Sequence, residues 1–369
     1  MSRVLFYSFI VFYISAIVYL SATIPIGPHE ASVYYTDSDL LYFLTHFFEP
    51  YFDNSLAFRT PFVFFGLLNI PLFFHMSRLY FEKIEESYLA TSIYLLLPGI
   101  ITSTILVNIA VLVITFVLFF IIFYEKKIIW GQAFSMLVLL FIHDASIIFF
   151  MGLAIFFTIK KDRKLFFISI LFLLTSLFFF NGLEIGGRPE GEFLQLFGLY
   201  MALFSPLVFL YFFYALYRIL LREKKDILWF ISFTAFIFSI LLSLRQQVDM
   251  TDFAPYVIVS VVLMLVSSRK SVYVRLPQFQ TAYRLGFNLL FGSLVLSAMV
   301  IIFHQLFFTM LDDKSKHFAY PFYEPYWQML ELNEIGQNCY TVSNRKVQYQ
   351  LKYYGIESCE EKTVPKIHK

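Results

Sequence analysis

The sequence predicts an all-α polytopic membrane protein with about eleven transmembrane helices and a small α/β C-terminal tail on the outer side. Of its 369 residues, 59% are hydrophobic, 21% are aromatic and only 15% are charged. Soluble domains carry roughly 25% charged residues, so this composition excludes a water-soluble globule. The tail is the one stretch polar enough to fold in water. We therefore expect a transmembrane domain over residues 1–311 and a separate tail over residues 312–369.

The transmembrane domain is predicted from apolar runs that are long enough, or nearly long enough, to cross a bilayer as helices. The shortest pair flanks a polar turn at His143 and Asp144, where we expect residues that only satisfy the turn. The predicted spans are Val4–Ala22, Thr60–Phe81, Tyr88–Val107, Asn108–Tyr124, Ile128–Ile142, Ser146–Ile159, Leu165–Phe180, Leu196–Leu221, Ile227–Leu244, Phe253–Val266 and Leu285–Met310.

The basic residues predict the orientation of these spans. With the N-terminus inside, 17 of the 28 Lys and Arg residues lie in inner segments and only 3 in the outer loops. Because cytoplasmic loops are enriched in Lys and Arg, this bias predicts a cytoplasmic N-terminus and a C-terminus on the outer side. The bias and the two-cysteine outer tail fit a bacterial inner membrane, in which the C-terminus is periplasmic, and a eukaryotic endomembrane is the alternative. The basic residues fall in short loops between spans, so we expect membrane lipids and no nucleic acid as partners.

The first outer loop, residues 24–59, concentrates acidic side chains at the membrane surface and has no basic residue before Arg59. Carboxylates placed there can take a proton from an acceptor or hold a divalent cation. A solvated loop, with acids that only begin helices, is the alternative. The acidic residues and histidines of the loop are His29, Glu30, Asp37, Asp39, His46, Glu49 and Asp53.

The tail has the pattern of a small βαβ fragment. Residues 338–343 predict a strand, residues 345–354 predict a helix, and residues 355–357 lead into a second short strand. A fragment of this size holds little core alone. Cys339 and Cys359 lie at equivalent ends of the two strands. A disulfide and a pair of free thiols both stay open, because the sequence does not give the separation of the two Cα atoms.

Four stretches, in this order along the chain, carry a family resemblance: HEASVYY at His29–Tyr35, then Leu56–Phe81, Tyr94–Phe120 and Leu241–Ser267. The first resembles an Asp-Glu motif in a first outer loop, and the second an arginine-proline-glycine pattern that opens a second span. Together they resemble the family 39 glycosyltransferases, the protein mannosyltransferase and aminoarabinose transferase group, which has the multi-span GT-C fold.

The resemblance implies an enzyme that transfers a sugar from a polyprenyl-phosphate donor to a lipid, protein or glycan acceptor at the periplasmic face, with inversion. Glu30 matches the second acid of the family's pair and is the candidate base, with Asp37 as the other candidate. Arg59 and Arg245 match basic positions that face the donor phosphate. Arginine suits that role because its forked donors match phosphate oxygens and offset the charge of the leaving group.

The sequence departs from the family pattern at two positions. His29 stands where the first acid is expected, and we assign it, with Tyr256 and Arg188, to substrate or loop contacts. The resemblance also implies a divalent cation, Mg²⁺ or Mn²⁺, with Glu30 and Asn108 as candidate ligands. Asn108 stands where the family has an acid, and an amide oxygen ligates a cation without contributing charge.

Other interpretations of the same residues stay open. Glu30 can instead be a carboxylate in the first turn of a helix that accepts hydrogen bonds from backbone N–H groups. Arg59 can be an interfacial anchor. At the level of the whole chain, the alternatives are a flippase or carrier for lipid-linked saccharides, and a catalytically inactive GT-C-like scaffold. A carrier predicts charged residues deep in several spans and an internal repeat.

Overall fold

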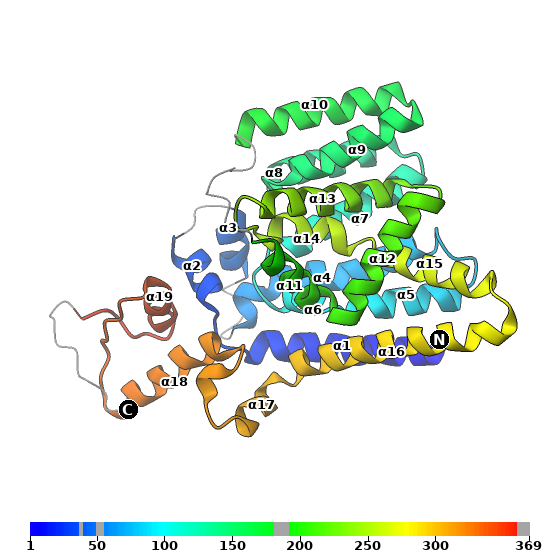
Figure 1. Ribbon diagram of the computed structural model, residues 1–369. Coiled ribbons are helices and arrows are strands. Elements are labelled where there is room, and N and C mark those ends of the chain that lie inside the picture. The colour runs from blue at the N-terminus through cyan, green and yellow to red at the C-terminus, as the bar shows by residue number, and fades with distance from the viewer. Residues whose placement is uncertain (37–39, 49–54, 181–191, 360–369) are drawn as a thin grey trace. The chain divides into compact units, whose positions relative to one another are not determined.

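The computed structural model describes residues 1–36, 40–48, 55–180 and 192–359, and almost all of its regular structure is helical. This confirms the all-α part of the prediction, and the apolar helices described next are consistent with a polytopic membrane protein. The helices are α1 (Arg3–Thr23), α2 (Pro28–Thr36), α3 (Leu40–Phe47), α4 (Leu56–Ser77), α5 (Ile84–Leu96), α6 (Pro98–Ile105), α7 (Ala110–Glu125), α8 (Ile129–Ile142), α9 (Ser146–Lys160), α10 (Arg163–Phe180), α11 (Phe193–Phe204), α12 (Pro206–Arg222), α13 (Ile227–Ser243), α14 (Met250–Ile258), α15 (Val261–Tyr273), α16 (Pro277–Ile302), α17 (His304–Met310), the 3₁₀ turn η2 (Lys314–Lys316), α18 (Tyr320–Glu334) and α19 (Arg345–Tyr353) (Figure 1).

Four helical segments within the described residues are long and apolar enough to cross a membrane: α1, α4, the segment Met250–Val272 and α16. Two bent pairs raise the number to six if each pair is one span. These are α5 with α6, bent by 63°, and α11 with α12, bent by 106°. Both bends precede a proline at the start of the second helix, because proline disfavours helical backbone at the residue before it.

Each predicted apolar run contains a helix or a helix pair, but α7, α8, α9 and α13 have only 10–17 residues. The count of about eleven crossings therefore stays a prediction.

The chain forms two compact units. Unit 1 comprises Met1–Ile14, Phe64–Thr104 and Asn108–Ile301. Unit 2 comprises Ser15–Val63, Ile105–Val107 and Ile302–Lys369. The expected division at residue 311 does not coincide with these units, because the tail and the first outer loop belong to the same one.

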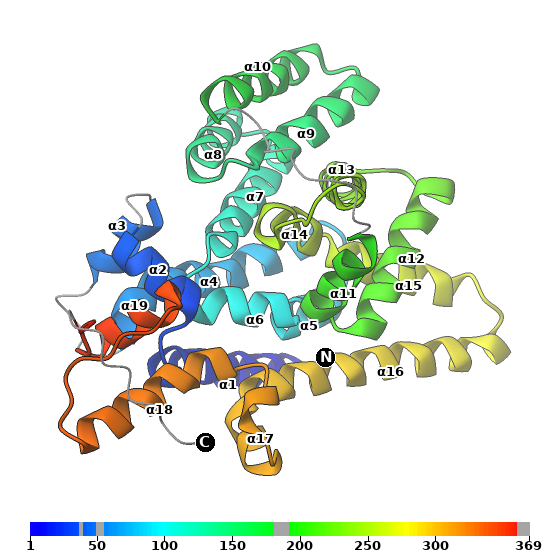
Figure 2. The same ribbon diagram turned by 60° about the vertical axis from the view of Figure 1, so that its left-hand side comes forward.

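Unit 1 is built from helices that pack side by side. Helix α9 packs against α8, α10 and α13, and α14 packs against α7 and α13, as both views show (Figures 1 and 2). Gly152 of α9 faces α13 at close range, since a Cβ atom there would lie 3.1 Å from the Cα atom of Ile231. Small residues at such positions let helix backbones approach, which gains packing energy that a lipid environment does not otherwise supply.

In unit 2, the tail helix α19 packs against α2, the helix that carries Glu30. The expected helix of the tail is present, but the two expected strands are reduced to one isolated parallel bridge between Cys339 and Glu357. Within the residues that the structure describes, two backbone hydrogen bonds join these segments, Tyr340 N–H to Glu357 O and Glu357 N–H to Asn338 O. The structure also decides the open question about the cysteines. Cys339 and Cys359 form a disulfide, with their Cα atoms 5.1 Å apart.

Candidate functional site

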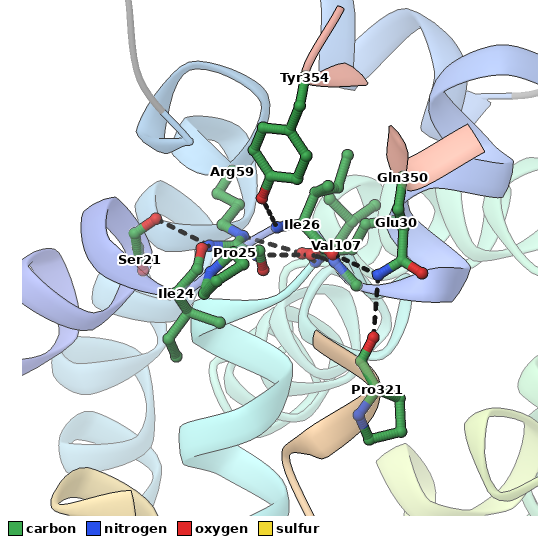
Figure 3. A network of polar contacts seen from close by, with 11 residues as sticks. Ser21, Ile24, Pro25, Ile26, Glu30, Arg59, Val107, Pro321, Gln350 and Tyr354 are labelled. Carbon is green, nitrogen blue, oxygen red and sulfur yellow. Dashed lines mark hydrogen bonds and ion pairs between the residues drawn. The ribbon is translucent and has the colours of Figure 1, made fainter. Parts of the chain in front are cut away.

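The centre of the candidate site is a buried ion pair between Glu30, in the first turn of α2, and Arg59, near the start of α4. Arg59 Nη2 lies 2.5 Å from Glu30 Oε2, and Arg59 Nε donates to Glu30 Oε1 at 2.9 Å (Figure 3). The contact is a two-pronged pair of charge-assisted hydrogen bonds, which are shorter and stronger than neutral ones. Arg59 is 0% exposed and Glu30 is 2% exposed, so this arginine is not an interfacial anchor that reaches into water.

Arg59 uses every donor that its guanidinium has. Besides the two bonds to Glu30, Nη1 donates to the carbonyl oxygens of Ser21 and Ile24, at 3.0 and 2.7 Å. Nη2 also donates to the carbonyl oxygen of Pro25, at 3.0 Å. A guanidinium has five N–H groups, and all five are therefore paired. The arginine binds the carbonyl groups at the C-terminal end of α1 and just beyond it, where helix carbonyls lack partners within the helix.

Glu30 is equally saturated. Its Oε2 atom accepts the N–H of Gly27 at 2.8 Å, and its Oε1 atom accepts the N–H of Val107 at 2.9 Å. With the two bonds from Arg59, the carboxylate fills about four acceptor positions, which is its full capacity. The bond to Gly27 is the reach-back of a first-turn acid to a backbone donor ahead of its helix. The interpretation of Glu30 as a helix-start carboxylate thus describes part of what it does.

Two side chains of the tail bind the backbone of Ile26, in the segment that leads into α2. The N–H of Ile26 donates to the hydroxyl of Tyr354 at 3.1 Å, and Gln350 Nε2 donates to the carbonyl oxygens of Ile26 and Pro321 at 2.7 and 3.0 Å (Figure 3). Burial raises the pKa of the Tyr354 hydroxyl, which keeps it neutral. Side chains far apart in the sequence therefore satisfy the backbone of this segment.

Gly27 is the residue that lets this segment close on the tail. A Cβ atom at this position would lie 2.5 Å from a ring carbon of Phe322 in α18. Pro28 follows as the first residue of α2, a position that suits proline because its missing N–H would have no partner there in any case. The sequence Gly27-Pro28 thus permits close packing on one side and begins the helix on the other.

The saturation of both side chains limits what the site can do in this arrangement. Glu30 has no free lone pair for the proton of an acceptor, and Arg59 has no free N–H for a phosphate oxygen. A catalytic role for either residue stays a prediction, and it requires the pair to open. Opening exposes two charges that are costly to bury without a partner, so it needs an incoming group that replaces one of them.

The two candidate metal ligands do not fit a cation in this arrangement. The oxygens of Glu30 are fully used, and Asn108 Oδ1 accepts the N–H of Ala110 at 2.8 Å, at the start of α7. Asn108 also lines a small cavity of about 70 Å³ in unit 1. Within the described ranges, no group of three or more His, Cys, Asp or Glu residues is gathered where it could hold a metal ion. We derive no step through a cation.

The remaining predicted residues are not assembled into one described site. His29 is exposed on α2, and Arg245 is exposed just after α13. Tyr256 is fully buried in unit 1, so it does not offer a surface for substrate. Asp37 and Arg188 lie outside the described residues.

Sequence reasoning missed two groups of polar residues. In unit 1, the His143 ring links Tyr256 and Asp252. Its Nδ1 atom lies 3.1 Å from the Tyr256 hydroxyl, and its Nε2 atom lies 3.5 Å from Asp252 Oδ1. In unit 2, Gln350 and Tyr354 bind the loop before α2. Their spacing of four residues on an amphipathic helix was a signal that both lie on one face, but nothing in the sequence indicates the backbone groups they meet.

Compared with models of known protein families and with curated proteins, the chain matches none of them. The family resemblance rests on the residue patterns alone.

Proposed function

We propose that this chain is a membrane glycosyltransferase of GT-C type that moves a sugar from a polyprenyl-phosphate donor to an acceptor at the periplasmic face of a bacterial inner membrane. In this proposal it crosses the membrane about eleven times, with a cytoplasmic N-terminus and a periplasmic tail. One observation carries the proposal. The resemblance selects Glu30 and Arg59 from two different motifs, and the two residues are 29 positions apart in the sequence. In the structure they form one buried ion pair.

The pair supplies a mechanism for coupling donor binding to activation of the base. Two oxygens of a donor phosphate can accept the parallel hydrogen bonds of an arginine fork as a carboxylate does, so the phosphate can replace Glu30 on Arg59. Glu30 is then released to accept a proton. The acceptor oxygen attacks the anomeric carbon, its proton passes to Glu30, and the bond to the phosphate breaks, with the electron pair leaving on the polyprenyl phosphate. One displacement inverts the anomeric centre.

The other assignments belong to the same proposal. Asp37 is the second candidate base, and Arg245 is the second contact for the donor phosphate. His29 and Arg188 are proposed contacts to substrate or to loops, and the buried Tyr256 is a contact to the turn at His143. Mg²⁺ or Mn²⁺ stays part of the proposal only as an added component, since both Glu30 oxygens are fully used and Asn108 Oδ1 already accepts the N–H of Ala110.

The test is transfer from a panel of radiolabelled polyprenyl-phosphate sugars in isolated membranes. We expect wild-type membranes to transfer sugar and Glu30→Gln membranes to lose transfer by at least about a hundredfold, since general-base catalysis contributes roughly 10²–10⁴. Asp313→Asn makes the same chemical change at an exposed acid of unit 2 and should keep full transfer. Membrane abundance of all three proteins is measured in parallel. Full transfer by a normally inserted Glu30→Gln protein would remove Glu30 as the base.

A chelator tests the cation separately. If transfer survives a strong chelator, the donor phosphate is neutralised by arginine alone, and Arg59→Gln should abolish transfer. If the chelator stops transfer and Mg²⁺ or Mn²⁺ restores it, a cation takes part through ligands that the present arrangement does not assemble.

A second function is favoured by a specific observation. The saturation of Glu30 and Arg59, together with Asn108 at the start of α7, is what a non-catalytic GT-C-like scaffold would have. Such a scaffold would bind polyprenyl-phosphate sugar without turnover. Binding of labelled donor to the purified wild-type protein, with no transfer to any acceptor fraction, would favour the scaffold over the enzyme.

A further inference from the structure

Unit 1 contains an arginine-lined cavity at the C-terminal ends of α12 and α15, which lie side by side in both views (Figures 1 and 2). The cavity has a volume of about 420 Å³. Arg218 and Arg222 line it from α12, Ser271 lines it from α15, and Arg275 lines it from just beyond α15. The candidate site in unit 2 shares no residue with it.

The arginines of α12 belong to one face of that helix. Tyr214, Arg218 and Arg222 follow one another at intervals of four residues, and Tyr217 and Leu221 fall between them on the same face. All five residues line the cavity. The sequence thus encodes a stripe in which aromatic and apolar residues alternate with arginine.

The cavity carries an excess of positive charge. Arg218 is fixed to the wall by a hydrogen bond from Nη1 to the buried hydroxyl of Ser271, and its Nε atom lies 3.5 Å from Glu223 Oε1. That carboxylate is shared with Lys270, whose Nζ atom lies 2.6 Å from Glu223 Oε2. The single carboxylate of Glu223 is therefore shared by two cations, Arg218 and Lys270. Ser271 and Glu223 hold the Arg218 guanidinium in place.

The other two arginines, Arg222 and Arg275, are available to bind an anion. In the part of the chain that the structure describes, neither Arg222 nor Arg275 forms an ion pair. The guanidinium of Arg275 lies over the ring of Tyr283 at 3.8 Å, a contact that orients the group and leaves its edge N–H atoms available. Both side chains are exposed. A ligand with negatively charged oxygens would satisfy them.

The rim of the cavity is apolar, whereas the rim of a site for a water-soluble anion would be polar. Leu221 is 60% exposed and Val274 is 85% exposed. In a chain that spans a membrane, exposed leucine and valine face acyl chains, and tyrosines are enriched where acyl chains meet head groups. Arginines next to such a rim match an amphiphile with an anionic head.

We propose that this cavity binds the phosphate head group of an anionic membrane phospholipid. Arg218, Arg222 and Arg275 donate to the phosphate oxygens, and the acyl chains lie along Leu221 and Val274. Basic pockets between transmembrane helices recognise anionic head groups in this way. The inference does not depend on the proposed glycosyltransferase activity.

Native mass spectrometry of the delipidated full-length protein tests the proposal. Phosphatidylglycerol and phosphatidylcholine with identical acyl chains are added, and the bound fraction of each is measured. We expect preferential retention of phosphatidylglycerol. The double variant Arg222→Gln/Arg275→Gln should weaken that retention by about fivefold for each arginine removed, with phosphatidylcholine unchanged. Neither arginine has an ion pair to lose in the described structure, so this variant should fold.

Two controls make the test decisive. Lys83→Gln/Lys126→Gln removes the same charge at exposed positions outside the cavity and should retain phosphatidylglycerol as the wild type does. An equal loss in that control would assign the effect to net charge and overturn the proposal. Retention of both lipids alike would overturn it too. Displacement of bound phosphatidylglycerol by millimolar inorganic phosphate would identify a site for soluble phosphate instead.

Discussion

The buried pair of Glu30 and Arg59 combines two opposing energetic terms. Removing two charges from water costs several kcal/mol for each ion, and their attraction offsets this only when the geometry is good and the remaining donors and acceptors are satisfied. Here both conditions hold. Arg59 has five bonds and Glu30 has four. The pair therefore links the end of α1, the start of α2, the start of α4 and Val107.

We expect Glu30→Gln to destabilise the protein by about 3–5 kcal/mol, because it leaves the buried Arg59 without a counter-charge. The measurement is the free energy of unfolding of purified protein in mixed micelles. Asp313→Asn, at an exposed acid, should leave it unchanged. A loss no larger than in this control would mean that water reaches Arg59 and that the pair is open in solution.

A second residue-scale prediction concerns His317. Its ring is 4% exposed, stacks on Phe308 with centroids 3.8 Å apart, and accepts the N–H of Ala319 at Nδ1. Burial lowers the pKa of His317. The folded pKa is then below the unfolded one, so the stabilisation is complete above about pH 6.5 and is lost as the pH falls further. His304 and Tyr323 are the titratable groups of neighbouring helices that belong to this cluster.

The measurement is the unfolding temperature from about pH 8 down to about pH 5, compared between wild type and His317→Asn. An asparagine oxygen can accept the Ala319 N–H in place of Nδ1 and does not titrate. The variant should therefore lose less stability on acidification than the wild type. Parallel curves for the two proteins would assign the acid sensitivity to other groups.

At the scale of elements, the tail and the first outer loop form one packed body. Helix α19 contacts α2, and the side chains that bind Ile26 are those of Gln350 in α19 and of Tyr354, which directly follows the helix. The disulfide between Cys339 and Cys359 joins the segments on either side of α19. Closing a loop of this size limits the unfolded chain and contributes about 3 kcal/mol in the loop-entropy account. The tail thus acts as a brace for the loop that carries Glu30.

Gly27 tests this brace. We expect Gly27→Ala to destabilise the protein by about 1–3 kcal/mol, because its methyl group would overlap the Phe322 ring and force the loop or α18 to move. Gly286→Ala in α16 is the matched control. A Cβ atom there meets nothing within 4 Å, so thermal stability should stay equal or rise. Equal stability of both variants would show that the loop and α18 are not in firm contact.

Sequence reasoning located the elements and two site residues but not their connections. The apolar runs located the helices of the predicted spans because span length and hydropathy are local properties. Glu30 stood out through the motif in an acidic loop, and Arg59 as the first basic residue of that loop. Their pairing was not visible, because it depends on where the loop between them returns. The bond to the Val107 N–H was equally hidden, since a backbone group has no sequence signature.

At the scale of the whole molecule, the number of crossings determines where the tail lies. The described residues include four helical segments suited to crossing, or six with the two bent pairs. An even number returns the C-terminus to the side of the N-terminus. The predicted arrangement of about eleven adds α10 and the shorter helices α7, α8, α9 and α13 to these six, and it places the termini on opposite sides. Finding out whether the two termini lie on the same side or on opposite sides therefore distinguishes an even from an odd number of crossings, and the individual spans need not be mapped.

We expect the termini to lie on opposite sides. In a Cys339→Ser/Cys359→Ser background, single cysteines at Ser2, Lys126 and Ser315 are reacted in intact cells with a membrane-impermeant maleimide. Ser315→Cys should react, and Ser2→Cys and Lys126→Cys should react only after the membrane is permeabilised, because basic segments stay cytoplasmic. The wild-type disulfide gives an independent readout, since it should form in an oxidising periplasm and stay reduced in the cytoplasm. Protection of Ser315→Cys together with reduced Cys339 and Cys359 would place the tail in the cytoplasm. If Ser2→Cys is protected in intact cells as well, the number of crossings would be even.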